Sequence, residues 1–172
     1  MSALAASGSV FKYETKSVFE LVLHHDDRRS IQAPEIGSRA LEVNVLCTRM
    51  PATLMAMERA VELARGLNAR LHLLVAQEVS YAVPLESPPV LVEFQEALFR
   101  DIAQGCGLET HVGIFLCRDA EETFLRQLAP HSVVVLGARR SWWFTRERRL
   151  ARRLRRAGHE VVVVYMKGNR NA

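Results

Sequence analysis

The chain has 172 residues, which suits one domain with its own core rather than two. Its hydrophobic content of 49% argues against a disordered chain, and no apolar run approaches the roughly 20 residues of a membrane-spanning helix, so we expect no membrane span. The three cysteines form no CxxC pair and the N-terminus has no signal-peptide pattern, so we expect a reduced, cytoplasmic protein.

The net charge of +4 is distributed unevenly along the chain. From residue 137 to the end there are eleven Lys and Arg against two acids, which gives +9. Residues 1–136 hold 12 bases and 17 acids, which gives −5. This uneven charge gives information about the partners that the protein could bind, but none about its fold.

The first 38 residues differ in pattern from the rest. Between Phe11 and Leu23 most apolar residues alternate with Lys and Glu, a period of two that favours a half-buried strand, although the apolar second half also fits a short helix. The polar stretch 24–39 is typical of a linker. We therefore predict three parts, an N-terminal extension over 1–38, a domain over 39–167 and a short tail over 168–172.

From residue 40 onward, apolar strand-like runs alternate with helical patterns. Pro51 suits the first turn of a helix, where its missing N–H costs nothing, and Asp119 and Thr145 suit N-caps. In chain order we predict strand 41–46, helix 51–67, strand 71–75, a loop over 80–89, helix 90–104, strand 110–116, a short helix after Asp119, strand 133–136, helix 145–157 and strand 161–165.

Each long helix has a predicted buried stripe at helical spacing. Gly66 is the predicted stop of the first helix. The stripes are Leu54, Met57, Val61, Ala64 and Leu67 on the first helix, Leu91, Phe94, Leu98 and Ile102 on the second, and Leu150, Ala151, Leu154 and Ala157 on the last.

The alternation of strands and helices predicts an α/β fold with a doubly wound parallel sheet. Several of the strands are continuous Val, Leu and Ile runs, as strands covered on both faces require. In such sheets ligands bind beyond the carboxyl ends of the strands, at the switch point. The segments that would line such a site are Cys47–Pro51, Gln77–Pro84, Cys117–Asp119 and Gly137–Thr145.

Three segments resemble the universal stress protein family. Residues 57–74 are similar to the family's first helix and second strand, residues 132–139 to its fourth strand and the glycine after it, and residues 153–165 to its last helix and valine-rich closing strand. The resemblance covers residues 41–167 and implies a Rossmann-like fold of five parallel strands in the order 3-2-1-4-5. Members of that family often form homodimers, and some bind ATP while others do not, so the resemblance implies a homodimer and leaves ATP binding open.

The ATP-binding branch of that family carries an Asp at the end of its first strand and G-x2-G-x9-G-[ST] after its fourth. Its glycines let backbone N–H groups approach the phosphates. Here Thr48 stands at the Asp, Gly137 matches the first glycine, and Arg140, Leu150 and Ala151 stand at the other three positions. We therefore expect a degenerate or non-ATP-binding member, with no useful affinity for ATP and no cofactor.

Two arrangements stay open for the segment after the fourth strand. In the first arrangement, Trp142 or Trp143 fills the pocket that holds the nucleotide in ATP-binding members of the family. In the second, Arg139 and Arg140 hold an anion with their side chains, beside the Gly137 backbone. In the first case the tryptophans are structural. In the second they can supply stacking area next to the arginines.

No set of residues has the spacing of a catalytic site. The run from His24 to Asp27 could ligate a metal only poorly, because adjacent side chains converge badly on one ion. Cys47 and Cys117 each follow a predicted strand, where a thiol sensor is conceivable and an inert buried cysteine is favoured. We expect neither an enzyme nor a metal site.

The helix 145–157 is unusually rich in arginine. Like charges at i,i+4 repel, so fold alone would be better served by mixing in Glu. One interpretation is a solvated face paired in part with the acidic body, and the other is a surface for an anionic partner. The predicted contact residues of that surface are Trp142, Trp143, Arg148, Arg152 and Arg155.

The closing strand is predicted at an edge of the sheet, because the family resemblance puts it last in the strand order. An exposed apolar edge invites aggregation unless it is covered. A two-fold copy of the same strand would cover it, with Val161, Val163 and Tyr165 as dimer contacts, and the segment Phe11–Leu23 is a rival cover.

Together these patterns predict a non-enzymatic, universal-stress-protein-like domain that acts as a homodimer and binds an anionic partner. The favoured partner is an acidic protein, including the membrane-proximal part of a transporter. A degenerate site for a nucleotide or phosphate is the first alternative. The second alternative is a nucleic-acid-associated protein that uses the arginine-rich helix. We rank it below an acidic protein partner because the sequence has no motif that recognises a groove of nucleic acid.

Overall fold

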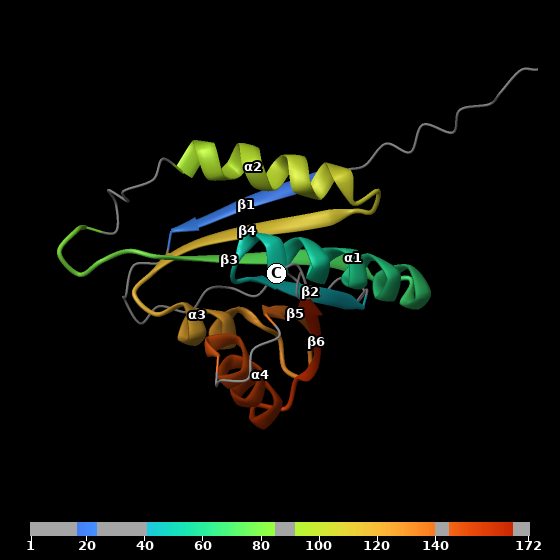
Figure 1. Cartoon of the computed structure of the whole chain (residues 1–172). Coiled ribbons are helices and arrows are strands. Elements are labelled where there is room, and N and C mark those ends of the chain that lie inside the picture. The colour runs from blue at the N-terminus through green and yellow to red at the C-terminus, as the bar shows by residue number, and fades with distance from the viewer. Residues whose placement is uncertain (1–16, 24–40, 85–91, 140–144, 167–172) are drawn as a thin grey trace, which may run out of the picture.

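The computed structural model describes residues 17–23, 41–84, 92–139 and 145–166. They form a six-stranded sheet with helices on both faces (Figure 1). The elements in chain order are β1 (Ser17–Leu23), β2 (Glu42–Cys47), α1 (Met50–Leu67), β3 (Arg70–Glu78), α2 (Val92–Gly105), β4 (Thr110–Cys117), α3 (Ala120–Gln127), β5 (Val133–Arg139), α4 (Arg146–Arg156) and β6 (Glu160–Met166). None of the helices in these residues has the length and hydropathy of a membrane span.

All neighbouring strands run parallel, in the order β1-β4-β3-β2-β5-β6. The last five strands therefore lie in the predicted order 3-2-1-4-5, which confirms the fold class. The order reverses at β2, because the chain first moves from β2 to β3 and β4 and then returns to β5 and β6. That reversal is the switch point of the sheet.

The sixth strand, β1, lies within the segment predicted to be strand-like. It pairs with β4, with Ser17 opposite Thr110 and Leu23 opposite Leu116. The interpretation of Phe11–Leu23 as a rival cover for the closing strand is therefore wrong, since β1 and β6 lie at opposite edges (Figure 1). Residues 11–16 lie outside the described residues.

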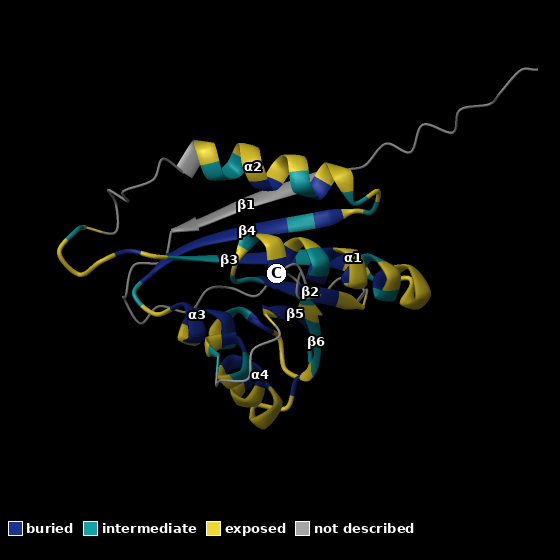
Figure 2. Cartoon of the chain, in the orientation of Figure 1, coloured by how far each residue is buried: buried dark blue, intermediate teal, exposed yellow. Residues whose placement is uncertain are grey.

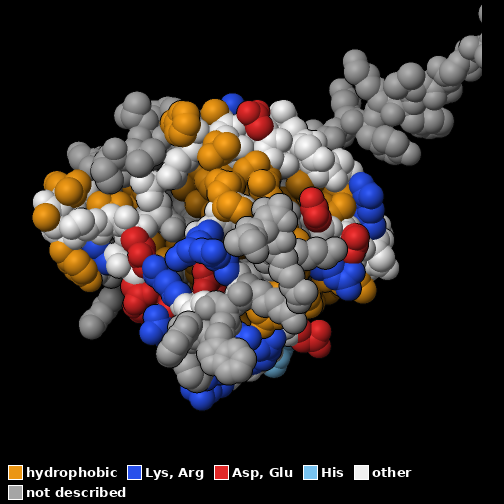
Figure 3. Space-filling model, in the orientation of Figure 1, with side chains coloured by type: hydrophobic (Ala, Val, Ile, Leu, Met, Phe, Trp, Pro, Cys, Tyr) orange, Lys and Arg blue, Asp and Glu red, His pale blue; other side chains and the backbone are white. Residues whose placement is uncertain are grey.

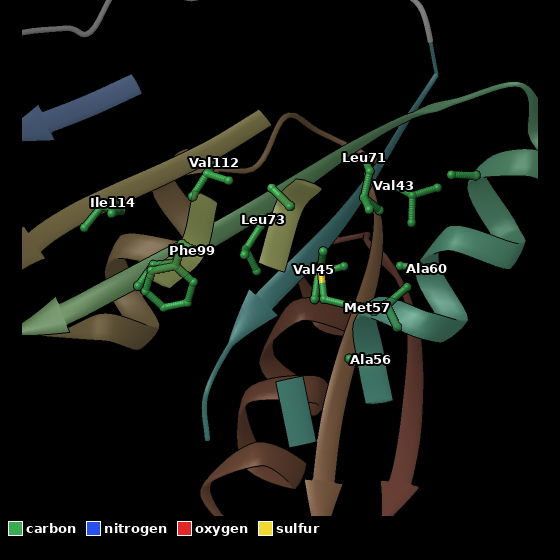
Figure 4. Packing of buried hydrophobic residues seen from close by; sticks show 14 residues of the cluster. Val43, Val45, Ala56, Met57, Ala60, Leu71, Leu73, Phe99, Val112 and Ile114 are labelled. Atoms are coloured by element: carbon green, nitrogen blue, oxygen red, sulfur yellow. The ribbon is translucent and has the colours of Figure 1, made fainter. Parts of the chain in front are cut away.

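Two hydrophobic cores lie on the two faces of the sheet. On one face, α1 and α2 cover Val43, Val45, Leu71 and their neighbours (Figure 4). On the other, α3 and α4 cover alternate residues of the same strands, such as Leu46, Leu74 and Leu136. Most residues in the middle of the central strands are buried (Figure 2), as expected for strands covered on both faces.

The buried face of α1 is made of small residues, which corrects the predicted stripe. Leu54 and Leu67 are 43% and 47% exposed, whereas Ala56, Ala60 and Ala64 are completely buried. Met57 and Ala64 are the predicted stripe residues that are fully in the core. Small side chains let the helix axis lie close to the sheet. The leucines therefore lie at the margin of the helix–sheet contact, partly exposed to solvent.

The stripe on α2 is displaced in the same way. Phe94 is 68% and Leu98 39% exposed, while Phe99 and Ala103 are buried against the sheet and Ile102 packs partly against them. Both stripes, 94/98 and 99/103, have helical spacing, so periodicity cannot decide between them. Leu91 lies outside the described residues.

The helix ends follow the predicted caps except at the end of α1. Asp119 and Thr145 accept hydrogen bonds from the N–H groups of Glu122 and Arg148. Helix α1 ends at Leu67, where Asn68 takes the left-handed conformation at φ 50°, so Asn68 replaces Gly66 as the stop. In α4 the predicted stripe residues Leu150, Ala151 and Leu154 are buried, and Ala157 is exposed.

Gly137 is needed where β5 meets the first turn of α1. A Cβ built on Gly137 would lie 2.0 Å from the backbone oxygen of Ala52. No side chain fits between this strand and the helix, so the glycine serves a close backbone approach.

We predict that Gly137→Ala lowers the free energy of unfolding by about 3 kcal/mol, because the new methyl group pushes against helix backbone. Gly66→Ala is the matched control, since nothing lies within 4 Å of its Cβ position. It should raise the stability by about 0.5–1 kcal/mol through helix propensity. Urea unfolding of both variants measures the difference, and a Gly137→Ala protein as stable as wild type would show that α1 does not approach β5 so closely.

Candidate functional site

A cavity of about 660 Å³ lies at the carboxyl ends of β2, β3 and β5, beside the first turns of α3 and α4. This is the switch point, where crevices of doubly wound sheets take their ligands. Three of the four predicted segments supply lining residues. The cavity is lined by Cys47, Thr48, Arg49, Ala76, Glu78, Ala120, Glu121, Phe124, Arg139, Thr145, Arg146, Glu147 and Leu150.

Thr48 lies in the cavity wall and is tied to its neighbours. Its N–H donates to Thr53 Oγ1 at 3.2 Å, and its hydroxyl donates to the carbonyl of Gly137 at 3.4 Å. Gly137 itself belongs to β5 and faces α1. The glycine that matches the phosphate-loop pattern is therefore explained by packing.

Arg139 ends β5, is exposed, and lines the cavity. The other three residues predicted beside it, Arg140, Trp142 and Trp143, lie outside the described residues. The structure thus brings Thr48 and Arg139 together at one cavity.

A buried carboxylate, Glu121, joins α3 to α4. Its side chain is 9% exposed and lies 2.8 Å from Arg153, 3.5 Å from Arg149 and 3.8 Å from Arg146. Figure 3 shows Lys and Arg side chains next to Asp and Glu side chains in the lower half of the molecule, where Figure 1 places α3 and α4. One carboxylate thus holds three guanidinium groups.

Two more carboxylates at the cavity are paired with arginines. Glu78 makes a two-pronged contact with Arg146, with one bond at 3.2 Å, and also accepts from the N–H of Ala120 at 3.1 Å. Glu147 is buried and lies 3.8 Å from Arg49. Three glutamates therefore balance arginines inside the cavity, so the cavity is less basic than its arginine count indicates.

Sequence reasoning missed Glu121 and Glu78. The charge asymmetry between the two parts of the chain was the only available signal, since it indicated some pairing of the basic helix with the acidic body. The pairings cross 28 residues for Glu121 and Arg149 and 68 for Glu78 and Arg146. Only the packing of α4 beside α3 and β3 selects them.

The arginines of α4 divide between two flanks of the helix. Arg146, Arg149, Arg152, Arg153 and Arg156 line a groove of about 360 Å³ together with Thr145. We call this the arginine groove. It adjoins the cavity, since Thr145 and Arg146 line both.

The other flank of α4 faces β6. Arg148 lies over the ring of Tyr165, 5.8 Å from its centre, and Arg155 donates to the carbonyl of Val161 at 2.8 Å. Of the three arginines predicted to bind a partner, Arg152 therefore lines the groove, while Arg148 and Arg155 contact the closing strand.

Arg118 organises the loop that follows β3. Its guanidinium donates to the carbonyls of Val79, Ser80 and Val83, and Tyr81 lies 5.1 Å from it in a cation–π contact. Tyr81 is 83% exposed. A backbone-binding arginine of this kind has no sequence signature.

The cysteines are poor nucleophiles. Burial raises the pKa of the Cys47 thiol, and the hydrogen bond from Thr53 offsets only part of that effect. Burial also raises the pKa of Cys117 and of Cys106. Within the described ranges, no three His, Cys, Asp or Glu side chains are grouped so that they could hold a metal ion.

The Glu78–Arg146 pair predicts a pH dependence of stability. The hydrogen bond from Arg146 lowers the pKa of Glu78 below its ordinary value of 4.5. A lowered folded pKa stabilises the protein above pH 4.5, and that contribution is lost as the pH falls through the folded pKa. Glu78→Gln, which keeps an acceptor for Ala120, should therefore be less stable than wild type at pH 7.

Thermal unfolding of wild type and Glu78→Gln from pH 7 downward tests this. The gap between their melting temperatures should close below pH 4.5. A gap of constant size would mean that the charge of Glu78 contributes nothing and that the difference is one of packing.

Comparisons with known proteins find likeness in structure alone. No family model matches the sequence, and no curated protein matches it. Among solved structures, the universal stress protein from Archaeoglobus fulgidus is 13% identical with a TM-score of 0.51, and covers 72% of this chain and 92% of that one. A protein of the universal stress protein family from Burkholderia pseudomallei is 23% identical with a TM-score of 0.50, over 74% and 98%. The chain therefore has the Rossmann-like fold of the universal stress proteins.

Proposed function

We propose that this chain is a non-enzymatic binding domain that forms a homodimer and holds an anionic partner in the arginine groove. The observation that carries the proposal is the groove itself, whose charged lining residues are all arginines. Free thiols at Cys47, Cys106 and Cys117 are in keeping with a reduced, cytoplasmic setting.

The position of the arginines is more informative than their type. The chain has only three lysines, Lys12, Lys16 and Lys167, so arginine is its usual base everywhere. The gathering of five of them on one flank of α4 is the local feature. Guanidinium groups make two-pronged hydrogen bonds to carboxylates and phosphates, so such a flank suits an anion.

The groove retains positive charge after its internal pairs are counted. Helix α4 contains seven arginines and one glutamate, and Glu147 pairs with Arg49 outside the helix. Among the described residues, Glu121 and Glu78 are the carboxylates that pair with α4 arginines on the groove side. Even with Arg152 left out of the count, Arg146, Arg149, Arg153 and Arg156 outnumber these two carboxylates, and the surplus gives a local positive field that would attract an anionic partner.

The closing strand supports the homodimer. The N–H of Glu160 donates to the carbonyl of Ser132, the residue before β5. In this parallel ladder the backbone groups of Val161, Val163 and Tyr165 therefore point to the free edge. These are the three predicted dimer residues. Arg155 already bonds the Val161 carbonyl, which leaves Val163 and Tyr165 to pair with a second copy.

The absence of catalysis is part of the proposal, and the raised pKa of all three thiols argues against a cysteine nucleophile. A site for a nucleotide or other phosphate compound is the second candidate. The observation in its favour is the cavity, because about 660 Å³ lies within the range of small-molecule sites. The three glutamates in its wall count against a triphosphate.

We predict that the protein is a dimer in solution and that Val163→Pro makes it a monomer. Proline at 163 removes an N–H that points to the free edge and leaves the ladder with β5 intact. Val163→Ala is the control, since it trims the side chain and keeps the N–H. Sedimentation velocity measures the masses, and a dimeric Val163→Pro protein would place the dimer interface elsewhere.

We further predict that the arginine groove binds polyanions. Arg149, Arg152 and Arg156 replaced together by Glu should abolish binding to a panel of poly-L-glutamate, inorganic polyphosphate and single-stranded DNA. The matched control replaces Arg59, Arg65 and Arg126, which lie outside the groove, by Glu. Fluorescence anisotropy at about 50 and about 200 mM salt gives affinity and salt dependence. Equal affinities for the two variants would overturn the proposal.

A further inference from the structure

We infer that the arginine groove is a receptor for a linear chain of phosphate groups and that Glu121 is its positioning residue. This inference rests on the proposed function and names the chemistry of its partner. Three observations carry it, namely the spacing of the arginines along α4, the way Glu121 fixes them, and their exposure to solvent.

The groove arginines follow the axis of α4 closely. Arg146, Arg149, Arg153 and Arg156 are three or four residues apart, so they rise by about 4.5–6 Å from one to the next and span about 15 Å. Arg152 adds a fifth guanidinium within that span. The groove therefore offers about one guanidinium group per 4 Å of length.

That density matches a phosphate chain better than an acidic peptide. Each strand of a DNA double helix carries one phosphate charge per about 3.4 Å of helix axis. An extended peptide places same-face side chains about 6.5–7 Å apart, and a helix returns to the same face about every 5.4 Å. A row of carboxylates at that spacing would not reach every guanidinium group of the groove, whereas a phosphate chain would.

Glu121 fixes the arginines before any ligand arrives. Its carboxylate lies within 3.8 Å of Arg146, Arg149 and Arg153, and its side chain is 9% exposed. A long arginine side chain loses rotamer freedom when it binds a ligand, and that loss of entropy weakens binding. Because Glu121 has already ordered three of them, that cost does not fall on the ligand.

The fixed guanidiniums still have donors to spare. The side chains of Arg146, Arg149 and Arg153 are 54%, 67% and 43% exposed although each contacts Glu121. A guanidinium has five N–H donors, and one carboxylate cannot use the donors of three such groups. The unused donors of these side chains can bond phosphate oxygens, which accept two-pronged contacts.

The test uses the full chain and compares polyphosphate with poly-L-glutamate of similar charge and with inorganic phosphate. We expect polyphosphate to bind at least about tenfold more tightly than either at the same salt concentration. Arg149→Gln with Arg156→Gln should reduce the slope of log affinity against log salt by about 1.4. The same charge loss on the other flank, Arg148→Gln with Arg155→Gln, should leave the slope unchanged.

Glu121→Gln separates positioning from bulk charge. It makes the groove more positive by one unit, so simple attraction predicts tighter binding of polyphosphate. Positioning predicts the reverse, a several-fold loss of affinity, because the three arginines regain their freedom. Circular dichroism confirms that the variant is folded, and if it is not, the two pairs of arginine variants decide the inference alone.

The outcomes distinguish this inference from the proposed function. One outcome is that poly-L-glutamate binds as tightly as polyphosphate, with Arg149 and Arg156 required for both. That result would overturn the assignment of a phosphate ligand and leave a groove that binds anions in general. Tighter polyphosphate binding by a folded Glu121→Gln protein would overturn the positioning role. No binding of any polyanion would overturn both the inference and the proposed function.

Discussion

The close approach of α1 to β5 is the constraint on which the site depends. Gly137 has no side chain where the Ala52 backbone passes, and Ala56, Ala60 and Ala64 continue a face of small residues along the helix. The start of α1 is thereby held at the carboxyl ends of β2 and β5. The cavity lies there because the loop before α1, the end of β5 and the first turn of α4 are brought to one place.

The charge network at Glu121 has two consequences. It joins α3 to α4 through a nearly buried carboxylate, which relieves the repulsion among neighbouring arginines that would otherwise destabilise α4. It also holds those arginines in a row beside the cavity. The same interaction that makes an arginine-rich helix tolerable therefore shapes the surface for which we propose an anionic ligand.

The two edges of the sheet are treated differently. At one edge the extension adds β1 to β4, so the strand order predicted for the domain gains a sixth member. At the other edge β6 keeps its outward backbone groups, and within the described residues Arg155 covers the carbonyl of Val161. β1 and β6 are thus the two edge strands of the sheet, and β6 is the one for which we propose pairing with a second copy.

The sequence by itself determined the fold class, the order of elements, the caps at Asp119 and Thr145 and the buried stripe of α4 apart from Ala157, because these depend on local pattern and on burial of continuous apolar strands. The buried faces of α1 and α2 were decided by the tertiary structure, since Leu54 and Phe94 have the same helical spacing as the residues that pack. The partners of the arginines were decided in the same way. An ion pair between residues far apart in the chain, such as Glu121 and Arg153, leaves no periodic signal, and only the packing of α3 against α4 brings the two charges together.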